Sequence, residues 1–411
     1  MEFPGDGIPA AVKILDTSVD GLERWEEKGI GIDDFLEYHL KYPETRRSTA
    51  AVLSLFFRRK HLIDYLLRKL SRQSLQPWKR RILEIAVTQV LFCRESVPPE
   101  VAVSVAVDKM SREAGVGAGK FANALLRRIS AEPPEISDAP EAVLPPEVKK
   151  HWKKLMPRRM KELAAVFLTK PDFCVRACGD AAAPEGAEPL DFDFCGNFRF
   201  YHVNNPREFL ASPEFSAGKF YVQDPATAMA LSLFELNGDE KVCDLCAAPG
   251  GKGLMIAERL NKNGAITLFD RSEARQKLTM ENFSRRRLDA QYRIEVCEAA
   301  KATGLFDLVF CDVPCSNTGV FRRRPDALWR FSPSRLTELA GLQKEILGHA
   351  AKLVNSGGRL VYSTCSIEPD ENGTQVAEFL ASHPEFTLLR QRQLLPGAEY
   401  DGAYAAVMQK K

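Results

Sequence analysis

Apolar residues in the first 130 positions recur at the spacing of amphipathic helices. Five of them share the i, i+3, i+4, i+7, i+8 face of one predicted helix: Leu83, Ala86, Val87, Val90 and Leu91. Pro98 and Pro99 then interrupt the pattern, which resumes over residues 101–110. Residues 115–128 predict a loop and a last helix. We therefore expect residues 1–130 to form an all-helical domain.

The pattern changes after residue 130. Residues 131–146 hold five prolines and four acids with little to bury, a composition that predicts a linker. Residues 147–167 show the helical spacing again and predict one helix. We expect residues 147–220 to form a small α+β subdomain that packs on the domain that follows, and we find no catalytic chemistry in it.

From residue 221 to residue 411, short apolar strands alternate with helical periods. The predicted strands are 241–245, 265–269, 292–296, 305–311 and 359–362. Residues 334–353 predict a helix between the last two strands. This alternation predicts an α/β domain with a parallel sheet covered by helices on both sides. Ligands in such sheets bind at the carboxyl ends of the strands, so the loops there become the candidate site.

Composition limits the classes of protein that remain. With 45% hydrophobic and 27% charged residues, the 411-residue chain has the composition of a globular protein of two or three domains. The chain has no apolar run of roughly eighteen residues, and Glu2 and Asp6 do not resemble an export signal. The ten cysteines show neither a disulfide framework nor two C-x-x-C pairs for zinc. We expect a cytoplasmic protein with no metal and no membrane contact.

Basic residues gather in one stretch although the net charge is only +2. The segment 46–81 carries eleven cations and a single acid, Asp64: the cations are Arg46, Arg47, Arg58, Arg59, Lys60, Arg68, Lys69, Arg72, Lys79, Arg80 and Arg81. A local charge of +10, eleven minus one, attracts a phosphate backbone and predicts RNA binding, although solvated helix faces are the alternative.

Small residues follow the first predicted strand of the α/β domain. The turn reads Cys246, Ala247, Ala248, Pro249, Gly250, Gly251 and Lys252. It lacks the spacing of a dinucleotide or ATP loop, so we expect a different nucleoside-type cofactor. Asp270 ends the second strand, where a carboxylate can bind both ribose hydroxyls. Glu298 follows the third strand and could meet an adenine amino group or remain a surface acid.

Two cysteines lie at the ends of adjacent predicted strands. Asp312 and Cys315 follow the fourth strand, and Cys365 follows the fifth. A thiolate that adds to carbon 6 of cytosine makes carbon 5 nucleophilic enough to take a methyl group from a sulfonium donor. Asp312 could donate a proton to ring N3 if burial raises its pKa. The alternative for both cysteines is a small buried hydrophobe, and we assign the remaining strand cysteines to that role.

The motifs around these residues resemble the RsmB/Nop2/Sun family of RNA 5-methylcytosine methyltransferases. The matching segments are F-Y-V-Q-D-P-A from Phe220, C-A-A-P-G-G-K from Cys246, D-V-P-C-S-N-T-G from Asp312, R-R-R-P-D-A-L-W from Arg322 and Y-S-T-C-S-I-E-P-D-E-N from Tyr362. The resemblance covers about 190 residues and implies a Rossmann-like domain that uses S-adenosylmethionine.

Site roles also follow from this resemblance. It implies that Cys365 is the nucleophile and that Cys315 assists release of the methylated product. It further implies that the 246–252 turn, Asp270, Glu298 and Asp312 hold the cofactor. Family members usually carry Asp at the position of Glu298, so this residue departs from the family's pattern.

The helical first 130 residues look like a NusB-type RNA-binding domain. Such a domain before the catalytic one implies 16S rRNA as the substrate and leaves the oligomeric state open. A tRNA substrate is one alternative, and a ribosome-assembly or antitermination factor without turnover is another. An amino-group methyltransferase would need an Asn/Asp-Pro-Pro-aromatic loop where Asp312, Val313, Pro314 and Cys315 stand.

Overall fold

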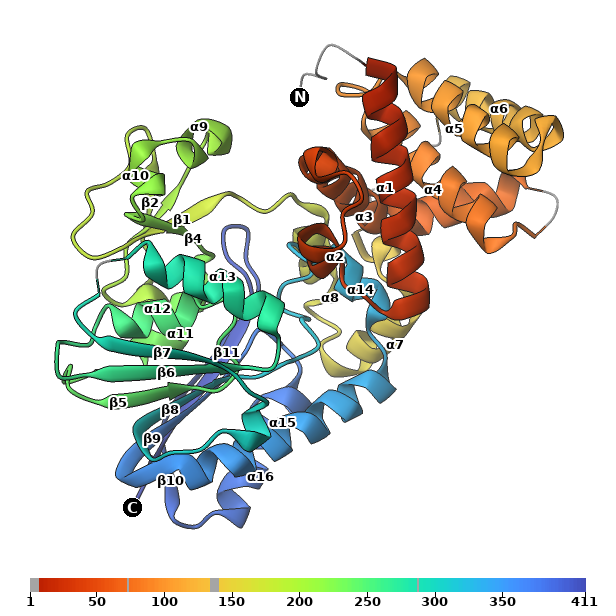
Figure 1. Ribbon diagram of the computed structural model, residues 1–411. Coiled ribbons are helices and arrows are strands. Elements are labelled where there is room, and N and C mark those ends of the chain that lie inside the picture. The colour runs from red at the N-terminus through yellow and green to blue at the C-terminus, as the bar shows by residue number, and fades with distance from the viewer. Residues whose placement is uncertain (1–6, 72–73, 134–139, 287) are drawn as a thin grey trace. The chain divides into compact units, whose positions relative to one another are not determined.

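The computed structural model describes residues 7–71, 74–133, 140–286 and 288–411. The chain divides into two compact units (Figure 1). The helical unit comprises residues 1–169 together with 324–330, and the sheet unit comprises residues 170–323 and 331–411. None of the helices among the described residues combines the length and apolar character needed to span a membrane.

The helical unit confirms the all-helical expectation for the first 130 residues. Its first helices are α1 Gly7–Lys28, α2 Ile32–Tyr38, α3 Arg46–Leu70, α4 Pro77–Phe92, α5 Pro99–Ala114 and α6 Val116–Ala131. Helices α4 and α5 each begin at a proline, where the missing N–H would have no intrahelical partner. Helix α4 is the centre of the unit, since every residue from Arg81 to Val90 is buried.

Residues 140–169 differ from the sequence-based division. They belong to the helical unit, whereas the sequence placed 147–220 together as one subdomain. The single helix expected over 147–167 is two helices, α7 Pro146–Leu155 and α8 Met160–Leu168, because Pro157 cannot continue the backbone hydrogen bonding. In the predicted linker, residues 134–139 lie outside the described part, and Val143 and Leu144 are buried.

A short helix from late in the chain completes the helical unit. Helix α14, Pro325–Arg330, packs on α3 (Figure 1). The Trp329 Nε1–H donates to the carbonyl of Phe57 at 2.8 Å, and the buried Asp326 carboxylate accepts the backbone N–H of Ile32 at 3.4 Å. Arg324 pairs with Asp33 at 3.0 Å. The segment is therefore part of the helical core although it is remote in sequence.

The sheet unit contains a seven-stranded sheet in the order β10-β11-β9-β8-β5-β6-β7. The strands are β5 Lys241–Asp244, β6 Ala265–Asp270, β7 Gln291–Val296, β8 Phe306–Asp312, β9 Val354–Thr364, β10 Phe386–Leu394 and β11 Ala403–Lys410. All neighbouring pairs from β7 to β9 are parallel, and β11 runs antiparallel to both β9 and β10. The sheet is therefore mixed, which corrects the fully parallel expectation.

Helices cover both faces of this sheet, as expected (Figure 1). Helices α11 Met229–Ser232, α12 Gly251–Ala257 and α13 Glu273–Ser284 lie on one face, and α15 Pro333–Leu353 and α16 Gly373–Ser382 lie on the other. The chain order reverses between β5 and β8, which lie side by side while β6 and β7 extend to one side. Such a switch point opens a crevice at the carboxyl ends of the strands.

A small antiparallel sheet precedes the large one. Its strands are β1 Cys174–Ala177, β2 Glu188–Leu190, β3 Phe200–His202 and β4 Phe220–Val222, in the order β2-β3-β1-β4. Short helices α9 Pro206–Leu210 and α10 Pro213–Ser216 connect β3 to β4. An apolar cluster that includes Val175, Tyr201 and Phe220 holds this sheet together.

Candidate functional site

The turn after β5 is held in place by its own sheet and by α13. The guanidinium of Arg275 donates to the carbonyl of Ala248 at 2.6 Å, and the amide of Asn282 donates to the carbonyl of Pro249 at 3.0 Å. Gly250 has φ +95°, and a Cβ there would lie 2.8 Å from the Thr279 methyl carbon. Only glycine fits both the backbone conformation and this close packing.

Asp270 lies beside this turn, as its place at the end of β6 predicted. Its two carboxylate oxygens accept backbone N–H groups from Ala248, at 3.1 Å, and from Ser272, at 2.9 Å. The turn and the acid are therefore one rigid assembly at the carboxyl edge of the sheet. Glu298 differs, because its exposed carboxylate pairs with Lys301 at 3.0 Å.

An acid that the sequence analysis passed over lies under the turn. Asp244 ends β5 and is fully buried, and burial, with Asp312 nearby, raises its pKa to about 8. Within the described residues, its Oδ1 atom has no hydrogen-bond partner. A buried carboxylate oxygen without a partner fits a ligand that brings positive charge or a hydrogen-bond donor.

Asp312, at the end of β8, contacts a cation and a hydroxyl group. The Lys252 ammonium lies 2.5 Å from its Oδ1 atom, and the Ser363 hydroxyl donates to the same oxygen at 3.0 Å. A cation and a hydroxyl donor therefore hold this carboxylate in a fixed position at the carboxyl edge of the sheet. The acid that burial keeps protonated at this edge is Asp244.

The two predicted cysteines meet. The Sγ atoms of Cys315 and Cys365 are 3.2 Å apart, and the Cys365 thiol also lies 3.3 Å from the side-chain oxygen of Asn317. The hydrogen bond to Cys365, together with burial, raises the pKa of Cys315 well above its usual range. Cys315 therefore keeps its proton in the folded chain.

A hydrogen-bond network holds the two cysteine loops against each other. The Gly319 N–H donates to the carbonyl of Cys365 at 3.0 Å, and a Cβ on Gly319 would lie 2.6 Å from that oxygen. The buried carboxylate of Glu371 accepts both the backbone N–H and the hydroxyl of Ser316, at 2.8 and 2.5 Å. These contacts fix the distance between the cysteines. Asn317 and Glu371 were not among the predicted site residues, and their only signal in the sequence is their place in the two quoted motifs.

One arginine connects the first cysteine loop to two distant segments. Arg323 pairs with Asp224 and Asp401, each at 2.5 Å. Asp224 also accepts the Ala226 N–H at 2.9 Å, which explains the D-P-A motif after β4. Burial, and then the charge of Asp224, raise the pKa of Asp401 to about 7. This cluster ties the end of the 312–323 loop to the rest of the sheet unit.

The other eight cysteines take no part in the pair. All ten cysteines of the chain are reduced. Those assigned to packing are mostly buried: Cys93, Cys174, Cys178, Cys195, Cys243 and Cys311. Cys246, in the turn, and Cys297 are partly exposed.

Models of two protein families match separate parts of the chain. The family model described as 16S rRNA methyltransferase RsmB/F matches residues 231–405, and the model of the NusB family matches residues 12–131. Residues 231–405 belong to the RsmB/F methyltransferase family. The RsmB/F domain contains the turn, Asp270, Asp312 and both cysteines of the pair, and the NusB-family domain coincides with α1 to α6.

Curated relatives support the same assignment. The chain is 40% identical over 222 residues to the ribosomal RNA small subunit methyltransferase B of Vibrio cholerae serotype O1, a match that covers 51% of this chain and 50% of the relative. It is 29% identical over 351 residues to the probable ribosomal RNA small subunit methyltransferase B of Bacillus subtilis strain 168, covering 79% and 77%. The chain thus spans about half the length of the Vibrio relative.

Solved structures share the fold. The crystal structure of PH0851 covers 100% of both chains with a TM-score of 0.77 at 23% identity. The structure of NSun6 from Pyrococcus horikoshii with SFG covers 65% of this chain and 98% of its own, with a TM-score of 0.56 at 17% identity. At these identities the likeness concerns the fold.

Proposed function

We propose that this chain is an S-adenosylmethionine-dependent RNA cytosine-5 methyltransferase that acts on 16S rRNA in the cytoplasm. The observation that carries the proposal is the 3.2 Å contact between Cys315 and Cys365 at the carboxyl edge of the sheet. Two thiols at this edge suit a reaction in which one forms a bond to the substrate base and the other transfers a proton. The RsmB/F family of the domain and the names of the curated relatives support rRNA as the substrate.

The residues at the sheet edge fit S-adenosylmethionine. The 246–252 turn and Asp270 would hold its nucleoside portion, and Glu298, two residues after β7, would meet the adenine amino group. The unpartnered Oδ1 of Asp244 offers a buried acceptor for a cationic ligand. When bound, S-adenosylmethionine supplies an electrophilic methyl group.

Cys365 is the nucleophile in this proposal. Its thiolate forms a bond to carbon 6 of cytosine, which makes carbon 5 nucleophilic toward the methyl group. Cys315, whose raised pKa keeps it protonated in the resting site, would first pass its own proton to solvent and then take the proton from carbon 5. The electron pair left by that proton forms the carbon 5–carbon 6 double bond and expels the Cys365 thiolate, which lies 3.2 Å from Cys315. The Asp312 carboxylate, held by Lys252, would accept a hydrogen bond from the cytosine amino group.

Nucleoside analysis tests the proposal. The full chain is incubated with S-adenosylmethionine and separate transcripts of 16S rRNA and tRNA, and the digested RNA is resolved by chromatography and mass spectrometry. We expect 5-methylcytidine in the 16S rRNA. The same product in tRNA alone would change the substrate, N4-methylcytidine would reject the cysteine mechanism, and no methylated cytidine would favour a factor without turnover.

A further inference from the structure

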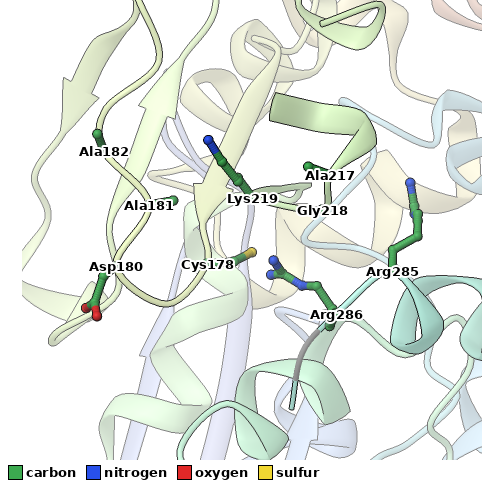
Figure 2. Close-up of a pocket in the computed structure, with 9 residues that line it drawn as sticks. All are labelled: Cys178, Asp180, Ala181, Ala182, Ala217, Gly218, Lys219, Arg285 and Arg286. Carbon is green, nitrogen blue, oxygen red and sulfur yellow. The ribbon is translucent and has the colours of Figure 1, made fainter. Parts of the chain in front are cut away.

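The sheet unit holds a basic cavity. It has a volume of about 550 Å³ and is lined by residues that follow β1, residues that precede β4 and the end of α13: Cys178, Asp180, Ala181, Ala182, Ala217, Gly218, Lys219, Arg285 and Arg286 (Figure 2). Three of these residues are cations and one is an acid. The cavity lies at the junction between the small sheet and α13, outside the cysteine loops.

Close packing fixes the walls of this cavity. Gly218 has φ +72°, and a Cβ there would lie 2.6 Å from the carbonyl oxygen of Arg285, so the loop before β4 is in contact with the segment after α13. Beneath them, the Glu258 carboxylate pairs with both Arg176 and Arg286 at 2.6 Å. Arg286 thus belongs to a largely buried network, and the cavity is formed before any ligand arrives.

The remaining two cations are available to a ligand. Lys219 and Arg285 are exposed, and among the described residues neither forms an ion pair. The Arg285 guanidinium is held by the side-chain oxygen of Asn282 at 2.5 Å and lies 5.9 Å from the centre of the Phe215 ring. Burial raises the pKa of Cys178 to about 11, so this thiol adds no negative charge to the cavity.

We propose that this cavity binds a phosphodiester of the substrate RNA through Lys219 and Arg285. RNA as the occupant rests on the proposed function, whereas the affinity for phosphate rests on the cations and the shape of the cavity. Three alanines and a glycine line much of the wall, and the two exposed cations suit phosphate oxygens, so we expect the contact to be made to the RNA backbone. The cavity lies in the size range of sites that hold a group as large as one nucleotide.

Hydrogen bonds connect Arg285 of the cavity to the 246–252 turn through Asn282. Asn282, which holds Arg285, also donates to the carbonyl of Pro249 and to the hydroxyl of Tyr221. A phosphate on Arg285 is therefore fixed relative to the turn that would hold the methyl donor. The cavity positions the RNA strand and assigns a role to the small sheet, in which the sequence showed no chemistry.

Titration of RNA binding with salt tests the proposal. Binding of the full chain to a fluorescently labelled, unstructured RNA oligonucleotide is measured by anisotropy over a series of salt concentrations, without S-adenosylmethionine. The double variant Lys219→Gln/Arg285→Gln removes both exposed cations and leaves the Arg286 network intact. The matched control is Lys277→Gln/Arg293→Gln, which removes two exposed cations of the same unit outside the cavity.

We expect the slope of log K against log salt to become shallower by roughly 1.4 in the cavity variant, at ~0.7 per phosphate contact, and affinity to fall by about tenfold near 0.1 M salt. The control should match the wild type. A cavity variant with the slope of the wild type would overturn the proposal, as would equal displacement of the RNA by millimolar inorganic phosphate in the wild type and in the cavity variant. Wild-type binding with the expected slope but no 5-methylcytidine would reject the proposed function alone.

Discussion

Burial changes the chemistry of single acids at the edge of the sheet, and Asp244 is the clearest case. The side chain is fully buried at the end of β5, and its pKa is raised from 3.8 to about 8. The folded chain therefore holds a proton that the unfolded chain releases. The stability from this proton is complete below pH 3.8 and is lost as the pH rises through about 8.

Replacing the acid by its neutral isostere should remove this dependence. We expect Asp244→Asn to gain unfolding free energy relative to the wild type as the pH rises, by about 1.4 kcal/mol per pH unit and by up to about 4 kcal/mol between about pH 5 and about pH 8. Urea unfolding of both proteins over this range measures the difference. A difference that stays constant with pH would mean that Asp244 does not hold its proton in the folded chain.

At the residue scale, strand ends could be predicted and their contacts could not. The turn, Asp270, Asp312, Cys315 and Cys365 were found because chemistry in parallel sheets gathers at the carboxyl ends of strands. The ion pair between Lys252 and Asp312 depends on the relative heights of two strands, which the spacing of apolar residues does not contain. The contacts of Asp312 could therefore not be predicted from the sequence.

Among the elements, α14 shows how a short segment can belong to a fold remote in sequence. Trp329 packs against the core of the helical unit, and the Lys60 ammonium lies 5.4 Å from the centre of its ring. The motif that contains it, R-R-R-P-D-A-L-W, was read as part of the catalytic domain. Pro325, Asp326, Ala327 and Leu328 are all buried, so the motif serves packing as well.

Removing the indole should destabilise the helical unit. We expect Trp329→Ala to cost about 2–4 kcal/mol, because it deletes a large packed ring and leaves the carbonyl of Phe57 without its donor. Differential scanning calorimetry of the full chain measures the effect. Tyr65→Ala, which removes an exposed ring from α3 of the same unit, is the control and should change little. Equal losses of stability in both variants would show that the contacts of Trp329 add no specific stability to the helical unit.

Helices and strands with a clear apolar pattern were predicted from the sequence, whereas the polar strand at the edge of the sheet was not. Helices α5 and α6 and strands β5 to β8 were placed to within a few residues, and the apolar face of α4 was recognised, because each has a clear apolar pattern. Strand β10 carries mostly exposed polar residues at the edge of the sheet, so neither an alternating nor a continuous apolar pattern marked it. The antiparallel β11 was missed with it.

In the molecule as a whole, several of the cations in the basic stretch 46–81 form ion pairs with acidic residues and are not free to bind RNA. Arg46 pairs with Glu37, Lys60 with Asp64 and Glu84, Arg80 with Glu26, and Arg81 with Glu23, Glu26 and Glu27. Arg58 is buried, Arg59 lies over the Phe92 ring, and Arg72 lies outside the described residues. Arg47, Arg68 and Lys69 are exposed, so RNA binding by the helical unit would rest on fewer cations than the sequence suggested.

Neutralising two of these exposed cations tests that surface. We expect Arg68→Gln/Lys69→Gln to make the salt slope of RNA binding shallower by roughly 1.4, since each lost phosphate contact removes ~0.7. Filter binding over a salt series gives the slope, and Arg112→Gln/Lys120→Gln on α5 and α6 provides the control of equal charge. If both double variants weaken binding alike, general electrostatic attraction explains the effect and the end of α3 is not a contact site.

The central claim, that Cys365 attacks the cytosine, is tested most directly by covalent trapping. Single variants Cys365→Ala and Cys315→Ala are incubated with 16S rRNA and S-adenosylmethionine and resolved on denaturing gels beside the wild type. Cys365→Ala should form no adduct and no 5-methylcytidine, because the bond to carbon 6 cannot form. Cys315→Ala should accumulate a protein–RNA adduct, because the bond forms but is not released. An adduct that persists in Cys365→Ala and disappears in Cys315→Ala would contradict the assignment and reverse the two roles.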